Sequence, residues 1–207
     1  MNLRSVSAPA TPRLRGRFRE ATRAAILEAA EDVYSRHGLS SGRMEQVAAT
    51  AGVSVGTLYN YFASREALVA AVHAARRSEL LDRIEQALAA TPERFEPRLG
   101  ALLSAIFTHL AAHRRFLSLF IQESPDASAT QGETSAQTQL EIRSRVCAVI
   151  ELGVAEGKLR NEPPRFFAAV LIGMVRAILA SLDDGEADAE SMSARVERAF
   201  LDGARRR

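Results

Sequence analysis

Apolar residues recur every three or four positions along most of the chain, which is the spacing of amphipathic α-helices. Between residues 19 and 37 this stripe contains Ile26, Ala29, Val33 and His37, and Gly38 follows where helices commonly end on a glycine. The same spacing predicts further helices at 44–51, 55–62, 65–89, 95–112, 116–121, 135–156, 164–182 and 188–204. Strand-like alternation does not compete with this pattern, so the sequence predicts an all-α fold.

The two short helices on either side of Gly52 carry the clearest functional signal. Their length and their glycine-centred turn are typical of a helix-turn-helix. In the second helix Leu58 and Phe62 form an inward pair, one turn apart. Its other side chains make a low, uncharged surface, formed by Val55, Gly56, Thr57, Asn60 and Tyr61.

Gly56 supports a binding role for that surface, because a helical glycine costs about 1 kcal/mol relative to alanine and allows a close approach of another backbone. A DNA major groove would provide this neighbour. Thr57 and Tyr59 can bond phosphate there, and Val55 and Thr57 can touch a thymine methyl. The alternative from these residues alone is an ordinary helical corner, with Tyr59 and Tyr61 packed in the core.

The net charge of +2 is divided unevenly along the chain. Residues 1–77 hold 11 arginines against 6 acidic residues, a net charge of +5, and the remainder is acidic. This division suggests a polyanion partner for the N-terminal part, although a solvated tail that binds nothing has the same composition. Pro9, Pro12 and Gly16 predict a disordered basic arm over residues 1–17.

Several classes of protein are disfavoured. The only cysteine, Cys147, allows no intrachain disulfide and no zinc-cluster spacing, and mid-helix packing or redox sensing are its two candidate roles. No apolar stretch approaches the roughly 18 residues of a membrane span, and the N-terminus lacks the apolar core of a signal peptide, so we expect a soluble, cytoplasmic protein. Glycine-rich phosphate loops and nucleophile elbows are absent from the sequence, so we expect neither an enzyme nor a cofactor.

The run MEQVAATAGVSVGTLYNYFASREALVAAV, residues 44–72, follows the helix ILEAAEDVYSRHG. Together these segments resemble the DNA-binding region of the TetR family of bacterial transcriptional regulators, over about residues 20–72. The resemblance implies a three-helix helix-turn-helix DNA-binding domain at 18–64, followed by a six-helix ligand-binding and dimerisation domain at 65–207. It also implies a recognition helix at 54–62.

Matched by position, the resemblance implies that Val55, Gly56 and Thr57 face base edges. Arg65 stands where the family usually has a phosphate-binding lysine. At Gly42 and Arg43 the sequence departs from the family, which tends to have threonines that cap the next helix and bind phosphate. We expect Arg43 to replace the phosphate contact and Ser41 to be the nearest capping candidate. The candidate DNA-binding residues are Arg43, Ser54, Val55, Gly56, Thr57, Tyr59, Asn60, Tyr61 and Arg65.

The last two predicted helices contain the candidate homodimer interface. Small residues recur every fourth position in the 164–182 helix, which lets another helix approach closely. These stripes fit packing inside one subunit equally well, and the family layout favours a dimer. The candidate interface residues are Ala169, Val170, Gly173, Met174, Ala177, Ile178, Val196 and Phe200. A two-fold dimer predicts an inverted-repeat operator.

The resemblance further implies a cavity for a small-molecule effector in the C-terminal domain. The candidate lining residues are Leu88, Phe107, Leu110, Phe116, Phe120, Arg143, Val146 and Ile150, all of which fit a plain core or a surface position as well. His109 and His113 have a metal-capable spacing, but no acid or cysteine near them in sequence supplies a third ligand, so no metal site is predicted. We therefore expect a ligand-responsive repressor of transcription that binds duplex DNA; the alternative is an architectural DNA-binding protein without an effector.

Overall fold

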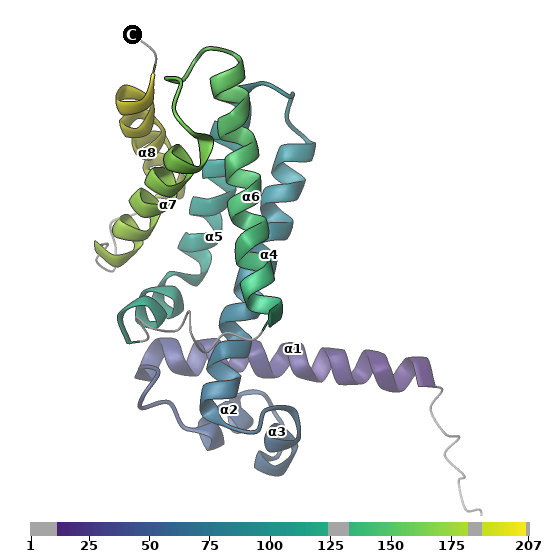
Figure 1. Ribbon diagram of the computed structural model, residues 1–207. Coiled ribbons are helices and arrows are strands. Elements are labelled where there is room, and N and C mark those ends of the chain that lie inside the picture. Colours follow the sequence, from purple (N-terminus) through teal and green to yellow (C-terminus); the bar gives the residue numbers. More distant parts are fainter. Residues whose placement is uncertain (1–11, 124–132, 182–187, 206–207) are drawn as a thin grey trace, which may run out of the picture. The chain divides into compact units, whose positions relative to one another are not determined.

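The computed structural model describes residues 12–123, 133–181 and 188–205, and all structural statements refer to these ranges. They form eight helices (Figure 1): α1 (Pro12–His37), α2 (Met44–Thr50), α3 (Val55–Tyr61), α4 (Arg65–Ala89), α5 (Phe95–Glu123), α6 (Glu133–Ala155), α7 (Pro164–Ser181) and α8 (Ala189–Ala204). Within these ranges the only β-type pairing is an isolated bridge between Leu159 and Arg205. The predicted all-α fold is confirmed.

Two helices differ from the expected bounds. α1 begins at Pro12, so residues 12–17 are helical rather than part of a disordered arm; proline is tolerated in a first turn because its missing N–H has no intrahelical partner there. Residues 1–11 lie outside the described residues. α5 is one helix bent at His113, whose backbone angles are φ −116° and ψ 15°, in place of separate helices at 95–112 and 116–121.

Residues 1–72 form the first of two compact units, built from α1, α2, α3 and the beginning of α4. Apolar side chains from all four helices meet in its core, because each helix buries one stripe and leaves its polar face exposed. The fully buried members with the largest side chains are Ile26, Tyr34, Leu58 and Leu68. This packing holds the short helices α2 and α3, which are too short to be stable alone.

Residues 73–207 form the second unit, in which α5 packs against α6, α7 and α8. Its buried core takes Leu99, Leu102 and Leu103 from α5 and matching apolar residues from the other helices. The rings of Phe167 in α7 and Phe200 in α8 meet edge to face, 6.0 Å apart. In the described part of the chain no helix is both long enough and apolar enough to cross a membrane.

Candidate DNA-binding surface and regulatory unit

The turn between α2 and α3 depends on Gly52, which has a φ of +67°. A residue with a side chain rarely adopts this left-handed conformation, so glycine is the residue that lets the chain reverse here. The backbone N–H of Val53 donates to the carbonyl of Ala48 at 3.0 Å and closes the turn. α2 and α3 thereby form the helix-turn-helix that the sequence predicts.

α3 is fixed at its start by Ser54. The Thr57 backbone N–H donates to Ser54 Oγ at 3.1 Å, and the two hydroxyls share a hydrogen bond of 2.8 Å. Leu58 is fully buried and Phe62 nearly so, which confirms them as the inward pair. The Ser54 hydroxyl is therefore engaged in capping α3, where it satisfies a backbone N–H that has no partner within the helix.

The outer face of α3 is open to solvent. Ser54, Gly56, Tyr59 and Asn60 are exposed, with 47% of Tyr59 accessible, while Val55, Thr57 and Tyr61 are half-buried. A Cβ built on Gly56 would meet only Ser54 Oγ, at 3.9 Å. Among the described residues no close neighbour requires a glycine at this position, and the space in front of it is open to the approach of another molecule.

Arginines of α1 surround the aromatic residues at the end of α3. The Arg19 guanidinium carbon lies 6.0 Å from the ring centre of Tyr61, and that of Arg23 lies 5.5 Å from the ring centre of Phe62. Both distances are within the range of cation–π attraction. The extended α1 therefore places positive charge beside the candidate recognition helix.

The start of α2 differs from the expectation. Its N-cap is Arg43, whose backbone N–H donates to the Gln46 side-chain oxygen at 3.0 Å, so Ser41 is not the cap. A capping box has two hydrogen bonds, each from a backbone N–H to the other residue's side chain. Because the Arg43 side chain has no acceptor atom, the bond to Gln46 is the one that can form here. The neighbouring Gly42 is explained by packing: a Cβ there would lie 2.5 Å from Cδ1 of Tyr34.

Arg65 is held against the same loop. Its Nη1 donates to the Ser40 carbonyl at 2.5 Å, and its Nη2 pairs with the Glu66 carboxylate at 3.1 Å. Arg65, Arg43 and Tyr59 line an open concave surface beside α3, together with the carboxylates of Glu45 and Glu66. Two guanidinium groups and a phenol on one concavity are well suited to hydrogen-bond phosphate oxygens.

Two family models match the sequence of this chain. Residues 26–72 match bacterial regulatory proteins of the tetR family, and residues 92–204 match the tetracyclin repressor-like C-terminal domain. The second match alone spans more than half of the chain. The chain belongs to the TetR family. It is therefore a DNA-binding regulator of transcription of the helix-turn-helix type.

Individual relatives agree with this assignment. The chain is 23% identical over 154 residues to the uncharacterized regulator YhgD of Bacillus subtilis, covering 74% of this chain and 80% of YhgD. It is 27% identical over 156 residues to the transcriptional activator FasR of Mycolicibacterium smegmatis, covering 75% and 69%. The crystal structure of FadR from Bacillus subtilis with stearoyl-CoA has a TM-score of 0.73 at 18% identity, covering 87% and 98%, and shows the same fold.

The candidate effector residues of this TetR-family chain lie in different surroundings. Phe107, Val146 and Ile150 are buried in the core of the second unit, with Leu88 and Leu110 packed against it. Phe116 is buried outside that cluster, and Arg143 is exposed. The side chain of Phe120 lies outside the described residues. A cavity of about 80 Å³ is lined by Phe107 and Leu110 together with Ala111, Arg114, Ile178, Leu179, Ala189 and Met192.

The candidate interface residues divide by helix. On α7, Ala169, Val170, Gly173 and Ala177 are exposed, and Met174 and Ile178 are half-buried. Phe166, one turn before Val170 and 52% exposed, extends this face; its i, i+4 spacing in the sequence would have revealed it. Val196 and Phe200 of α8 are each only 2% exposed and lie in the core of their own subunit.

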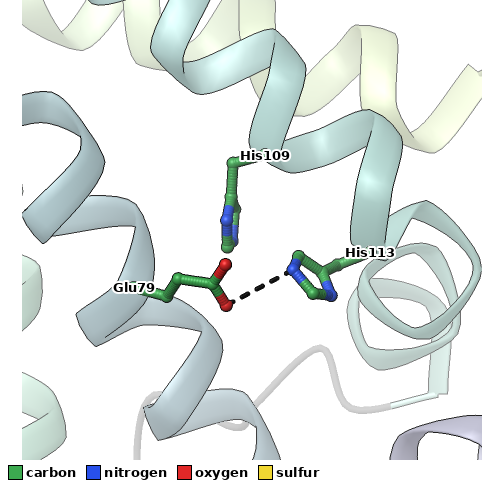
Figure 2. Close-up of side chains that lie close together, drawn as sticks. All are labelled: Glu79, His109 and His113. Carbon is green, nitrogen blue, oxygen red and sulfur yellow. Dashed lines mark ion pairs between the residues drawn. The ribbon is translucent and has the colours of Figure 1, made fainter. Parts of the chain in front are cut away.

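His109 and His113 acquire a neighbour that their sequence surroundings do not contain. Glu79 of α4 lies with them, and one possible ligand atom from each residue falls within 4.8 Å of the others (Figure 2). Although burial raises the pKa of Glu79, hydrogen bonds from Arg83 and Arg76 outweigh it and lower the pKa to about 2. Cys147 is half-buried, and burial raises the pKa of its thiol, which disfavours a reactive thiolate.

Proposed function

We propose that this regulator is a homodimeric repressor that binds an inverted-repeat operator and is released by a small-molecule effector. The observation that carries the DNA-binding part is the exposed, uncharged face of α3 beside Arg43 and Arg65. In this proposal Val55, Gly56 and Thr57 approach base edges, and Tyr59, Tyr61 and the two arginines hold phosphates. Asn60 and Ser54 lie at the edges of the contact.

The dimer is proposed to form through the exposed face of α7. Phe166 and Val170 are large apolar side chains that single soluble domains tend to keep covered, and Gly173 beside them would allow close helix packing. Val196 and Phe200 are left out of this interface because their own subunit already buries them. Two recognition helices related by two-fold symmetry would read half-sites about one DNA turn apart.

The effector is proposed to enter the second unit near Phe107 and Leu110. The cavity there, about 80 Å³, is well below the roughly 300–1,000 Å³ of typical ligand pockets. A ligand would therefore have to push helices apart, and we propose that α4 transmits this movement because it begins at Arg65 and continues to Ala89. A coupling free energy of about 1–3 kcal/mol would change operator occupancy about 5–150-fold.

Two tyrosine variants provide a matched test of DNA binding. Tyr59→Phe removes an exposed phenol hydroxyl on α3, whereas Tyr34→Phe removes a buried one in the same unit. Selection of random duplexes with the purified protein supplies the operator for the measurement. We expect Tyr59→Phe to weaken operator binding several-fold and Tyr34→Phe to leave it unchanged.

The outcome of the selection separates the two candidate functions. A repressor of the proposed kind should enrich inverted repeats and prefer them to random duplex by about 10³-fold or more. An architectural protein would enrich no sequence, and its affinity would fall with rising salt to the same extent for every duplex. Unchanged operator affinity in Tyr59→Phe would show that α3 does not contact the phosphates as proposed.

A further inference from the structure

A cluster of polar side chains lies between α4 and α5 in the second unit. It consists of Glu79 from α4 with His109 and His113 from α5, and the three side chains point toward one another (Figure 2). His109 and His113 are one helical turn apart, so both rings project from the same side of α5. Their ring centres are 4.7 Å apart.

His109 is the member that needs explanation. Its side chain is fully buried, and within the described residues neither ring nitrogen has a hydrogen-bond partner. A buried polar group without a partner costs about 1–3 kcal/mol, whereas an apolar residue of similar size would fill the same space without that cost. A histidine at this position is therefore unfavourable for packing and points to a ligand for its nitrogens.

One distance between ligand atoms in the cluster already matches that of a transition-metal site. His113 Nε2 lies 3.4 Å from Glu79 Oε2. Two ligands of one tetrahedral zinc ion, each bonded at about 2.0–2.1 Å, lie roughly 3.3 Å apart. All three ligand atoms are already within 4.8 Å of one another, so small side-chain rotations suffice to bring them around one ion.

We infer that Glu79, His109 and His113 form a binding site for one divalent transition-metal ion, of which Zn²⁺ is the best match. Two imidazoles and one carboxylate suit zinc, whereas Mg²⁺ and Ca²⁺ prefer oxygen ligands throughout. Three protein ligands leave one tetrahedral position for water or a small anion. This site does not depend on the proposed function, because it is defined by the ligand set alone.

Two arginines also bind Glu79 and shape this site. Arg76 Nη1 donates to Oε2 and Arg83 Nη2 to Oε1, both at 2.9 Å. A carboxylate accepts about four hydrogen bonds or ligand contacts, so the side of Oε2 that faces His113 remains open to a metal. The arginines orient the carboxylate as outer ligands do in known metal sites, and their positive charge lowers the affinity for a dication.

A bound ion would link α4 to α5 at the bend of α5. His113 is the residue whose backbone leaves helical geometry, and Glu79 lies midway along α4. The attraction between Glu79 and His113 depends on the charge of His113. The ion would replace it by three coordinate bonds, one to Glu79 of α4 and two to the histidines of α5. α4 would then be fixed to α5 more firmly than by the apolar packing of Leu80, Ile84 and Leu88 against the core alone.

The test uses the full-length protein, stripped of metal with a chelator and then titrated with Co²⁺ and with Zn²⁺. Co²⁺ reports tetrahedral coordination by its visible absorption, and Zn²⁺ affinity is measured by competition with a chromophoric chelator. We expect one ion per chain and at least a tenfold loss of affinity in Glu79→Gln and in His113→Gln. His37→Gln, which removes an exposed histidine at the end of α1, is the matched control and should bind as the unmodified chain does.

Glu79 and His113 are the residues chosen for substitution because both are partly exposed. Their variants should therefore remain folded, and circular dichroism will verify this. Substitution of the fully buried His109 is the less suitable change. The inference is overturned if the unmodified protein takes up no ion near a stoichiometry of one. It is equally overturned if Glu79→Gln and His113→Gln bind Zn²⁺ as tightly as His37→Gln.

Discussion

Gly173→Ala separates the stability of one chain from the stability of the proposed dimer. Gly173 lies inside α7, and a Cβ there would meet no atom within 4 Å among the described residues beyond the neighbouring backbone of its own helix. Replacing a helical glycine by alanine stabilises the helix by about 1 kcal/mol. Considered as a single chain, the variant is therefore expected to be more stable by about that amount.

The proposed dimer reverses this expectation at the interface. If two α7 helices pack closely at Gly173, each new methyl group enters an occupied space, and overpacking of this kind costs about 1–3 kcal/mol. The dimer dissociation constant should then rise about 5–150-fold, since each 1.4 kcal/mol is a factor of ten. Gly173→Ala should therefore stabilise the single chain and destabilise the dimer.

Sedimentation equilibrium measures the dissociation constant, and urea unfolding at several protein concentrations measures the chain stability, because unfolding of a dimer depends on concentration. Gly100→Ala is the control: it lies in α5, where a Cβ would meet only Glu197 Oε2 at 3.8 Å. It should gain helix stability without changing dimerisation. A Gly173→Ala protein that gains stability and keeps an unchanged dissociation constant would refute close packing of α7 at this residue.

Three further predictions concern single residues. Burial lowers the pKa of His73 to about 3, and Arg77 adds to the effect, so this group stays neutral in the folded chain. The unfolded chain takes up the proton below pH 6.5, and stability attributable to His73 is fully present above that pH and lost as pH falls from about 6.5 toward 3. At about 1.4 kcal/mol per pKa unit the loss is a few kcal/mol, and urea unfolding across this range should show a shallower pH dependence in His73→Gln. Tyr34→Phe removes a buried hydroxyl without a hydrogen-bond partner among the described residues, and should raise the unfolding free energy by about 1–3 kcal/mol in urea titrations. Gly42→Ala places a methyl group 2.5 Å from the Tyr34 ring and should lower the melting temperature, with an expected cost of about 1–3 kcal/mol; an unchanged melting temperature would show that the ring moves aside freely.

The helix-turn-helix was predictable because its determinants are local. Gly52 reverses the chain, Ser54 caps α3, and Leu58 and Phe62 face inward, all within about ten residues. Periodicity likewise located α4, whose observed ends match the predicted ones. The cap of α2 was missed because the acceptor comes from Gln46, three residues inside the helix, rather than from a residue before it.

The apolar stripes of the last two helices show the limit of periodicity. A stripe indicates that a face is covered, and it does not indicate which neighbour covers it. Val196 and Phe200 of α8 are buried in the core of their own chain, whereas Phe166, Val170 and Gly173 of α7 are exposed. Only the packed structure distinguishes these two faces, because the covering residues come from distant parts of the chain.

The sequence by itself determined the all-α fold, the helix-turn-helix and the inward and outward faces of α3, since each follows from spacing, capping and turn residues that are neighbours along the chain. Tertiary structure alone decided what surrounds His109 and His113. Glu79 lies about thirty residues earlier and meets them because α4 and α5 bring their polar positions to the same place. Contacts of this kind depend on how helices pack, and helix packing is set by the whole core rather than by any local pattern.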